Sequence, residues 1–119
     1  MPFLPMMYNL CNQTVTVHHR SEDGQFTATV FRNAFLDYKK VQNIDKTGSR
    51  EASSFLLIIP GSTQTVFHGD KVQMGEHPAC TTREEWAQMI PSKVPGLVVV
   101  QSVDVKYWNG KIVHTEAGG

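Results

Sequence analysis

Residues 66–91, VFHGDKVQMGEHPACTTREEWAQMIP, join two β-rich parts of the chain and carry its clearest helical pattern. The first half of this stretch predicts extended backbone with a turn at Gly69 and Asp70, because glycine reaches positive φ and aspartate favours turns. Runs with strand character lie on both sides of the stretch. We therefore expect it to be the structural joint between the early strands and a final hairpin.

The second half of the stretch predicts a short helix over about residues 82–90. Thr82 and Glu85 have the spacing of a capping box, and Pro91 ends the helical pattern. About two turns of helix are not stable alone in water, so the helix is expected to lie on a sheet. Its apolar face is expected to close one end of a barrel with Trp86, and that face comprises Trp86, Met89 and Ile90.

The C-terminal part of the chain predicts a hairpin. Residues 97–108, LVVVQSVDVKYW, form a long strand-like run, and residues 111–115 return after the Asn-Gly pair at 109–110. An Asn-Gly pair is the strongest short-range signal for a two-residue hairpin loop. The cross-strand pairs expected from that loop are Trp108 with Lys111 and Tyr107 with Ile112.

Three further runs predict strands before the joint. Residues 14–19 and 26–31 are β-branched and alternating, and a turn at 21–24 connects them. The second of these runs can continue to Tyr38. Residues 54–59, SFLLII, form a continuous apolar run typical of a strand buried on both faces. The whole pattern predicts one mainly β domain over residues 1–119, a small antiparallel β-barrel or sandwich with one short helix.

Residues 39–54 form the most polar segment and predict a long mobile loop, because glycine and serines interrupt any regular pattern. Loops of this length are usually functional or disordered. The segment is therefore either a solvated loop without a role or a loop that becomes ordered on a partner. Its candidate partner-contacting residues are the basic ones, Lys39, Lys40, Lys46 and Arg50.

Residues 1–12 predict an irregular N-terminal arm, because Pro2 and Pro5 deny backbone hydrogen bonds. The arm is too apolar to lie wholly in water. It either covers the end of the barrel or contacts another subunit, and its candidate contact residues are Phe3, Leu4 and Tyr8.

The composition excludes several classes of protein. Eleven basic residues balance eleven acidic ones, so no global field attracts nucleic acid or an anionic membrane. No window approaches the roughly 20 apolar residues of a membrane span, and the N-terminus lacks the basic region of a signal peptide. The two cysteines, Cys11 and Cys80, are expected to be reduced thiols in a chain made in the cytoplasm.

Four potential ligand residues, His68, Asp70, His77 and Cys80, lie within thirteen residues. Their spacing matches no standard zinc arrangement. Cys80 precedes a helix, yet a cysteine nucleophile needs a base oriented by a third group, and the sequence identifies no such group. We expect no catalytic site, no metal and no cofactor.

Four segments taken together carry a family resemblance: TVTVHHR, SSFLLIIP, FHGDKVQMGE and VPGLVVVQSVDVKYWNGKIVHTEAGG. From Thr14 onward the chain resembles the small minor capsid and head–tail connector proteins of tailed bacteriophages and of Firmicutes prophages. The resemblance implies a virion protein that forms a homo-oligomeric ring between the portal, adaptor and tail components and helps to retain packaged DNA.

In that resemblance, the polar segment 39–54 corresponds to a long loop that points into the channel, with its basic residues facing DNA or neighbouring subunits. The helix at about 82–90 departs from a minimal stopper barrel. The resemblance therefore leaves open whether the chain is a head-closure (stopper) protein, an adaptor or a tail terminator.

Two other readings remain from the residues alone. One is a small β-barrel module that binds a ligand or peptide in a pocket near Trp86, Tyr107 and Trp108. The other is a hydrolase or metal enzyme built on His68, His77 and Cys80.

Overall fold

The computed structural model describes residues 10–45 and 48–119, with residues 39–45 and 48–54 described as backbone. The described chain forms strands connected by turns, with one short helix. In chain order the elements are β1 (Gln13–Arg20), β2 (Phe26–Asp45), β3 (Gly48–Pro60), β4 (Lys71–Met74), α2 (Arg83–Gln88), β5 (Val98–Val99), β6 (Ser102–Trp108) and β7 (Lys111–Gly118).

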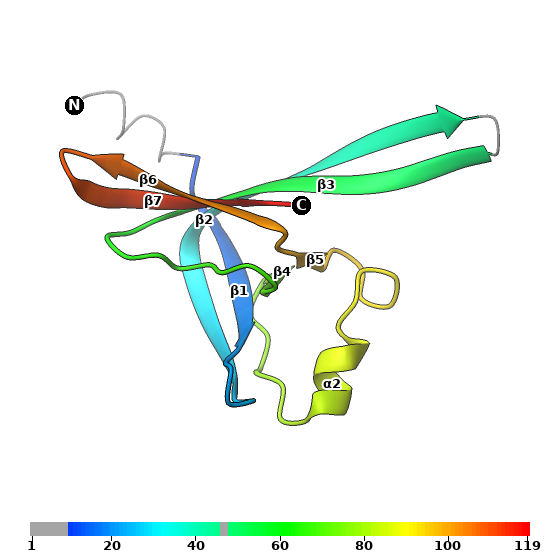
Figure 1. The fold of residues 1–119 in the computed structure, drawn as a ribbon, viewed down its shortest axis with the longest axis horizontal. Helices are drawn as coiled ribbons and strands as arrows, with labels where there is room; N and C mark the ends of the chain where they lie inside the picture. Colours follow the sequence, from blue (N-terminus) through cyan, green and yellow to red (C-terminus); the bar gives the residue numbers. More distant parts are fainter. Residues whose placement is uncertain (1–9, 46–47) are drawn as a thin grey trace.

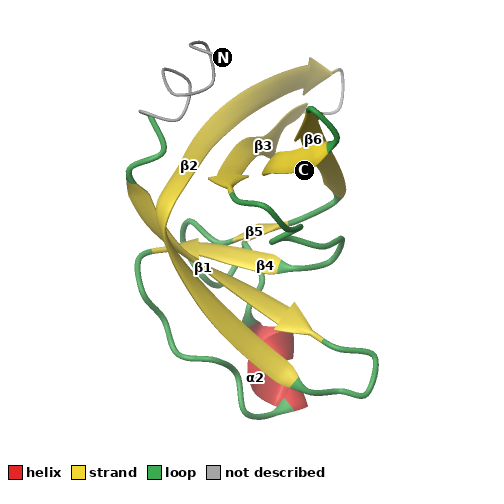
Figure 2. Ribbon diagram, turned by 90° about the vertical axis from the view of Figure 1, so that its left-hand side faces the viewer, coloured by secondary structure: helices red, strands yellow, loops and turns green. Residues whose placement is uncertain are grey.

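The strands form one antiparallel sheet in the order β5-β4-β1-β2-β3-β7-β6. This sheet curls into a half-barrel (Figure 2). The strands at its two ends, β5 and β6, are separated in the sequence only by Val100 and Gln101. The backbone N–H of Val100 donates to Asp70 at 2.8 Å, and that of Gln101 donates to Gly118 at 2.9 Å. One stretch of chain thus passes from one end of the curled sheet to the other, which confirms the predicted small antiparallel β-fold.

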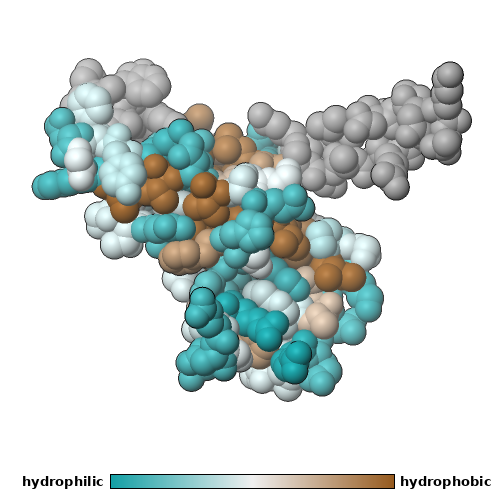
Figure 3. Space-filling model, viewed as in Figure 1, coloured by the Kyte–Doolittle hydropathy of each residue, from teal (hydrophilic) through white to brown (hydrophobic). Residues whose placement is uncertain are grey.

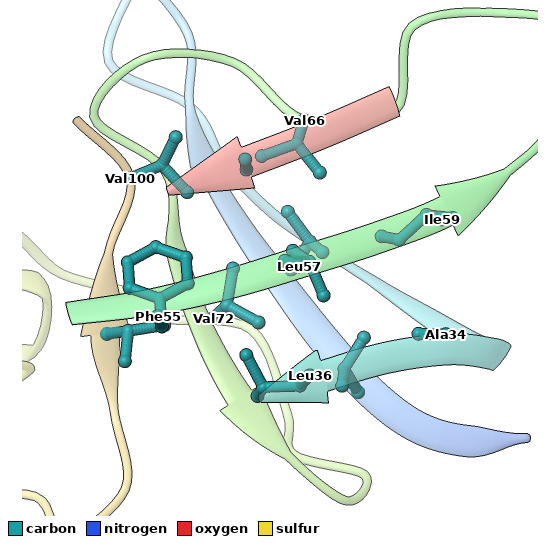
Figure 4. Packing of buried hydrophobic residues seen from close by; sticks show 12 residues of the cluster. Ala34, Leu36, Phe55, Leu57, Ile59, Val66, Val72 and Val100 are labelled. Carbon is teal, nitrogen blue, oxygen red and sulfur yellow. The ribbon is translucent and has the colours of Figure 1, made fainter. Parts of the chain in front are cut away.

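The hydrophobic core lies inside the curl and draws on nearly every strand (Figure 4). Leu57 and Ile59 of β3 are completely buried in it, and Ile58 on the opposite face of that strand is also buried. The predicted strand buried on both faces is therefore confirmed. The core cluster consists of Val15, Val17, Ala34, Leu36, Phe55, Leu57, Ile59, Val66, Val72, Val98, Val100 and Ala117.

The predicted C-terminal hairpin is present as β6 and β7. Asn109 and Gly110 both have positive φ, 53° and 76°, as the two-residue hairpin turn requires. The expected pairs of Trp108 with Lys111 and of Tyr107 with Ile112 are confirmed. Beyond them the register shifts, so that Lys106 pairs with His114, because a bulge adds one residue to β7.

The prediction of a long loop over residues 39–54 is wrong. These residues are the outer halves of β2 and β3, paired in register from Lys39 with Ser54 to Asp45 with Gly48. They extend well beyond the rest of the sheet (Figure 1). This part of the hairpin carries no alternation of apolar and polar residues that would identify strands in a sequence.

The predicted helix is confirmed, with shorter bounds. Thr82 caps α2, and its hydroxyl accepts the N–H of Glu85 at 3.1 Å. The expectation that Trp86 closes a barrel end is wrong, because no residue of α2 is buried. The helix lies instead beside the end of β1 and the start of β2 (Figure 2), where Trp86 contacts Phe26 with ring centroids 5.6 Å apart.

Candidate assembly interface

The outer hairpin, defined as residues 39–45 of β2 and 48–54 of β3, extends away from the rest of the fold in Figure 1. β2 pairs with β1 only up to Ala34, and β3 pairs with β7 only from Leu56 onward. Within the sheet, the two strands of the outer hairpin therefore pair only with each other. Seven residues of strand span about 23 Å. A two-stranded hairpin alone is marginally stable in water, so this element is a candidate for contact with a partner.

The overall dimensions agree with this projection. The radius of gyration is 15.5 Å, whereas a compact chain of this length has about 13.5 Å. The principal extents of 48, 39 and 23 Å describe a flat, elongated molecule. The fold therefore presents more surface than a compact domain of the same length.

The base of the outer hairpin is attached to the body through Tyr38. Its hydroxyl donates to the carbonyl oxygen of Gly96 at 2.7 Å, and partial burial raises the pKa of the phenol. Gly96 has a φ of 80°, which favours glycine at this turn. Opposite Tyr38 on β3, Phe55 is buried in the core. The direction of the outer hairpin is thus set by contacts on both of its strands.

We expect Tyr38→Phe to lower the free energy of unfolding by about 1 kcal/mol, because it removes one hydrogen bond and leaves the Gly96 carbonyl without this donor. Denaturant unfolding measures the change. Tyr107→Phe is the matched control, since Tyr107 is largely exposed and should change stability by less than about 0.5 kcal/mol. Equal effects of the two substitutions would contradict the role of Tyr38 in holding the hairpin.

The β6–β7 hairpin extends from the side of the molecule opposite to the outer hairpin (Figure 1). Its tip exposes two aromatic residues, Tyr107 at 63% and Trp108 at 43%. Nearby on β6, the Lys106 ammonium lies 2.6 Å from the Asp104 carboxylate and 3.8 Å from that of Glu116. These carboxylates, Asp104 first, raise the pKa of Lys106. On the face seen in Figure 3, hydrophobic residues gather across the middle of the body.

A buried polar layer covers the face of β1 and β4 that points away from the core. The Thr16 hydroxyl donates to the carbonyl of Gly75 at 2.7 Å and accepts the backbone N–H of His77 at 3.0 Å. The imidazole Nε2 of His18 lies 2.8 Å from Oε1 of Gln73. The chain that follows β4 is thus attached to the sheet by polar contacts.

His18 is the most buried ionisable group of this layer, with 1% of its surface exposed. Its Nδ1 has no hydrogen-bond partner among the described residues. Burial lowers the pKa of His18, the bond to Gln73 opposes that change, and the charges of His77 and Lys71 add to the lowering. The folded state therefore favours the neutral imidazole of His18.

We expect the stability of the protein to fall as the pH drops below about 6.5, the ordinary pKa of the imidazole. The unfolded chain binds this proton at a higher pH than the folded chain, so acid favours unfolding until the folded-state pKa is passed. The slope from one such group is at most about 1.4 kcal/mol per pH unit. Denaturant unfolding at a series of pH values measures it.

His18→Gln should flatten this pH dependence. An identical slope in the wild type and in His18→Gln would show that other groups cause the acid sensitivity.

Lys71 and Cys80 also belong to the polar layer. The Lys71 ammonium donates to the carbonyl of Trp86 at 2.5 Å and lies 4.5 Å from the centre of the Trp86 ring. Burial lowers the pKa of Lys71. Burial, and then the charge of Glu85, raise the pKa of the Cys80 thiol, whose Sγ contacts the sulfur of Met89 at 2.9 Å. These contacts hold α2 against the sheet and keep the thiol protonated.

The structure separates the four potential ligand residues of the joint. The Asp70 carboxylate lies 2.5 Å from Nδ1 of His19 and also accepts the backbone N–H of Phe67 at 2.9 Å. The His77 ring contacts the carbonyl of Met74, and His68 is exposed. Within residues 10–45 and 48–119, no group of three or more His, Cys, Asp and Glu residues could hold a metal ion.

The pair of His19 and Asp70 was missed by sequence reasoning. Asp70 is 2% exposed, and the pair forms because β4 lies beside β1 in the sheet. The two residues are 51 positions apart in the sequence. Alternation of residues within either strand carries no information about this neighbour.

The predicted contact residues are described only in part. The backbone of Lys39, Lys40 and Arg50 lies in the outer hairpin. Lys46 and the three residues of the arm, Phe3, Leu4 and Tyr8, lie outside the described residues. No helix in the described part of the chain is long and apolar enough to cross a membrane.

A family model described as "Family of unknown function (DUF6751)" matches residues 10–119. No curated protein and no solved structure matches the chain.

Proposed function

Because the chain belongs to DUF6751, a family of unknown function, we propose its role from its own sequence and structure: it is a subunit of the head–tail connector, or neck, of a tailed bacteriophage or prophage. In this role it assembles as a homo-oligomeric ring in the virion, contacts the portal, adaptor or tail components, and helps to retain packaged DNA. It acts without catalysis and without a cofactor.

The observation that carries this proposal is the outer hairpin. Its backbone pairs only within itself, although the half-barrel beside it has its own complete core. An extended hairpin of this kind is stabilised when a neighbouring molecule covers it, and it can then serve as the contact between the two molecules. Subunits of a ring supply such a neighbour on every copy, and many weak contacts then act together.

The sequence adds independent support. Four segments distributed from Thr14 to the C-terminus resemble connector proteins. The resemblance implies a long loop between the early and middle strands that points into the channel, and in this chain a hairpin takes the place of that loop. The outer hairpin occupies that position between the early strands and the buried part of β3. Lys39, Lys40 and Arg50 give it basic residues that suit contact with DNA.

Electron microscopy of particles tests the proposal. Particles from a host that expresses the wild-type gene should show a ring of this chain between head and tail. Particles from a strain without the gene should lack that ring density and accumulate as heads without tails. Normal, tailed particles in the absence of the gene would refute the proposed neck role.

A further inference from the structure

The chain that follows β4 passes over the polar layer of β1 and β4 and carries α2 (Figure 2). We propose that this segment, residues 76–90, is an acid-released strap: protonation of His18 beneath it detaches it from β1 and β4 while the half-barrel stays folded. The inference uses contacts within a single copy of the chain, so it does not depend on the proposed neck role.

The strap contributes almost nothing to the interior of the protein. Of residues 76–90, all of which the structure describes, only Cys80 is buried, and none belongs to the core cluster. Segments with few buried apolar contacts open locally at a lower free energy than unfolding of the whole domain requires. The strap can therefore leave the sheet without disrupting the core.

The start of the strap is attached to the sheet by weak contacts. The backbone N–H of His77 donates to the Thr16 hydroxyl at 3.0 Å. The Glu76 carboxylate pairs with the guanidinium of Arg32 on β2, and more than half of each side chain is exposed. Exposed ion pairs contribute little to stability. This end of the strap is therefore not held firmly.

The second attachment of the strap is Trp86 of α2. The Lys71 ammonium donates to its carbonyl at 2.5 Å and lies 4.5 Å from the centre of its ring. The same ring contacts Phe26 with centroids 5.6 Å apart. Trp86 itself stays partly exposed, so α2 is held by surface contacts and not by insertion into the core.

His18 lies in the polar layer that the strap covers, and only 1% of its surface is exposed. Its Nε2 lies 2.8 Å from Oε1 of Gln73, which is an acceptor, so Nε2 carries the proton of the neutral ring. A second proton must enter at Nδ1, which has no hydrogen-bond partner among the described residues. A buried cationic N–H without an acceptor is costly, whereas water solvates it once the strap has left.

The groups around His18 also disfavour its protonation while the strap is attached. Burial lowers the pKa of His18 most, and the charges of His77 on the strap and Lys71 on β4 lower it further. From β2 the paired residue is the uncharged Ala28. The Glu85 carboxylate of α2 belongs to an exposed residue. Release of the strap removes both the burial and the neighbouring charge of His77.

Acid therefore favours the released form. With the strap released, His18 is in water and binds a proton with the ordinary imidazole pKa of 6.5, whereas with the strap attached its pKa is lower. The released form binds more protons, so its population rises as the pH falls below 6.5 and stops rising below the pKa of the attached form. One such proton changes this population by at most about tenfold per pH unit.

The Cys80 thiol reports the release, because it is buried when the strap is attached. The full-length protein is treated with a pyridyl disulfide reagent, and mass spectrometry follows the modification of Cys80 separately from that of Cys11. Each rate is divided by the rate for Cys80 in urea-unfolded protein at the same pH, which cancels the pH dependence of the thiol reaction. The normalised rate should rise by up to about tenfold between about pH 7.5 and about pH 5.5.

His18→Gln is the matched variant, since glutamine can keep a contact with Gln73 and has no proton to gain. Its normalised Cys80 rate should differ by less than about twofold between the two pH values. Trp86→Ala should raise the rate at both pH values by a similar factor, about 2- to 10-fold, because it removes the ring contact with Phe26 and leaves His18 unchanged.

The urea dependence of the Cys80 rate distinguishes release of the strap from unfolding of the domain. Release exposes little surface, so urea should accelerate the modification much less than the m-value of global unfolding predicts. A urea dependence equal to that m-value would overturn the inference. A change of less than about twofold in the wild type between the two pH values, or an equal pH response in His18→Gln, would overturn it as well.

Discussion

Replacing residues 42–51 with Asn-Gly is expected to abolish the assembly of complete particles while leaving the domain folded. Val41 and Ala52 are paired on the two strands of the outer hairpin, so a two-residue turn can connect them directly. In the sheet, the removed residues pair only with each other. Shortening the connection also changes the entropy of loop closure only slightly.

Two measurements are needed for this variant. Thermal unfolding should shift by no more than a few degrees, which corresponds to less than about 1 kcal/mol. Complementation of a strain without the gene should yield no infectious particles, because the surface proposed to contact the neighbouring subunit is missing. The two results together distinguish an assembly element from a folding element.

The control for this prediction inserts two glycines between Asp23 and Gly24, in the turn at the other end of β2. This insertion changes an exposed turn of the same strand and should support normal particle formation. A large fall in the melting temperature of the shortened hairpin would instead show that the hairpin stabilises the domain. Full complementation by the shortened chain would remove the case for an assembly role.

Leu57→Ala is expected to have the largest effect on stability. Leu57 is completely buried at the centre of the core, between the strands of the curled sheet (Figure 4). Removal of its side chain loses transfer free energy and leaves a cavity, at a cost of about 2–5 kcal/mol. Since small domains have a total stability of about 5–15 kcal/mol, the melting temperature should fall by on the order of 10 °C or more.

Denaturant unfolding with an unchanged m-value would measure this loss. Leu10→Ala is the control, because Leu10 is exposed and lies before β1; its effect should stay within about 0.5 kcal/mol. A loss of less than about 1 kcal/mol for Leu57→Ala would show that β3 does not lie at the centre of the core.

The parts of the fold that sequence reasoning predicted correctly depend on local signals. The Asn109-Gly110 turn sets the β6–β7 hairpin, because both residues must accept positive φ. The capping contact between Thr82 and Glu85 sets the start of α2. The apolar run that includes Leu57 indicates a strand buried on both faces. In each case the deciding residues lie within a few positions of one another.

The outer hairpin was not predicted, because its two strands pair only with each other in the sheet and carry no local signal for strands. Strands are recognised in a sequence mainly through one face that packs on a core. Residues 39–54 show no alternation of apolar and polar residues that would mark such a face. Their polar composition therefore predicted a loop, although the pairing continues in register to Asp45 and Gly48.

The candidate assembly interface likewise depends on strand neighbours that the sequence alone does not predict. Asn109-Gly110 predicts a hairpin, but β6 is an end strand of the sheet only because β7 pairs with β3 on its other side. The pair of His19 and Asp70 forms only because β4 lies beside β1. These neighbours are distant in the sequence, so only the assembled sheet brings them together.

The sequence by itself determined the turns, the helix cap, the buried strand and the mainly β class, because each follows from backbone preferences or from a local apolar pattern. The tertiary structure alone decided the order of the strands, the half-exposed position of Trp86 and the projection of the outer hairpin. The physical reason is that strands pair through backbone N–H and C=O groups, which are the same in nearly every residue and so do not specify a partner strand. The packing of the whole core therefore decides which strands pair, and it leaves the two strands of the outer hairpin paired only with each other.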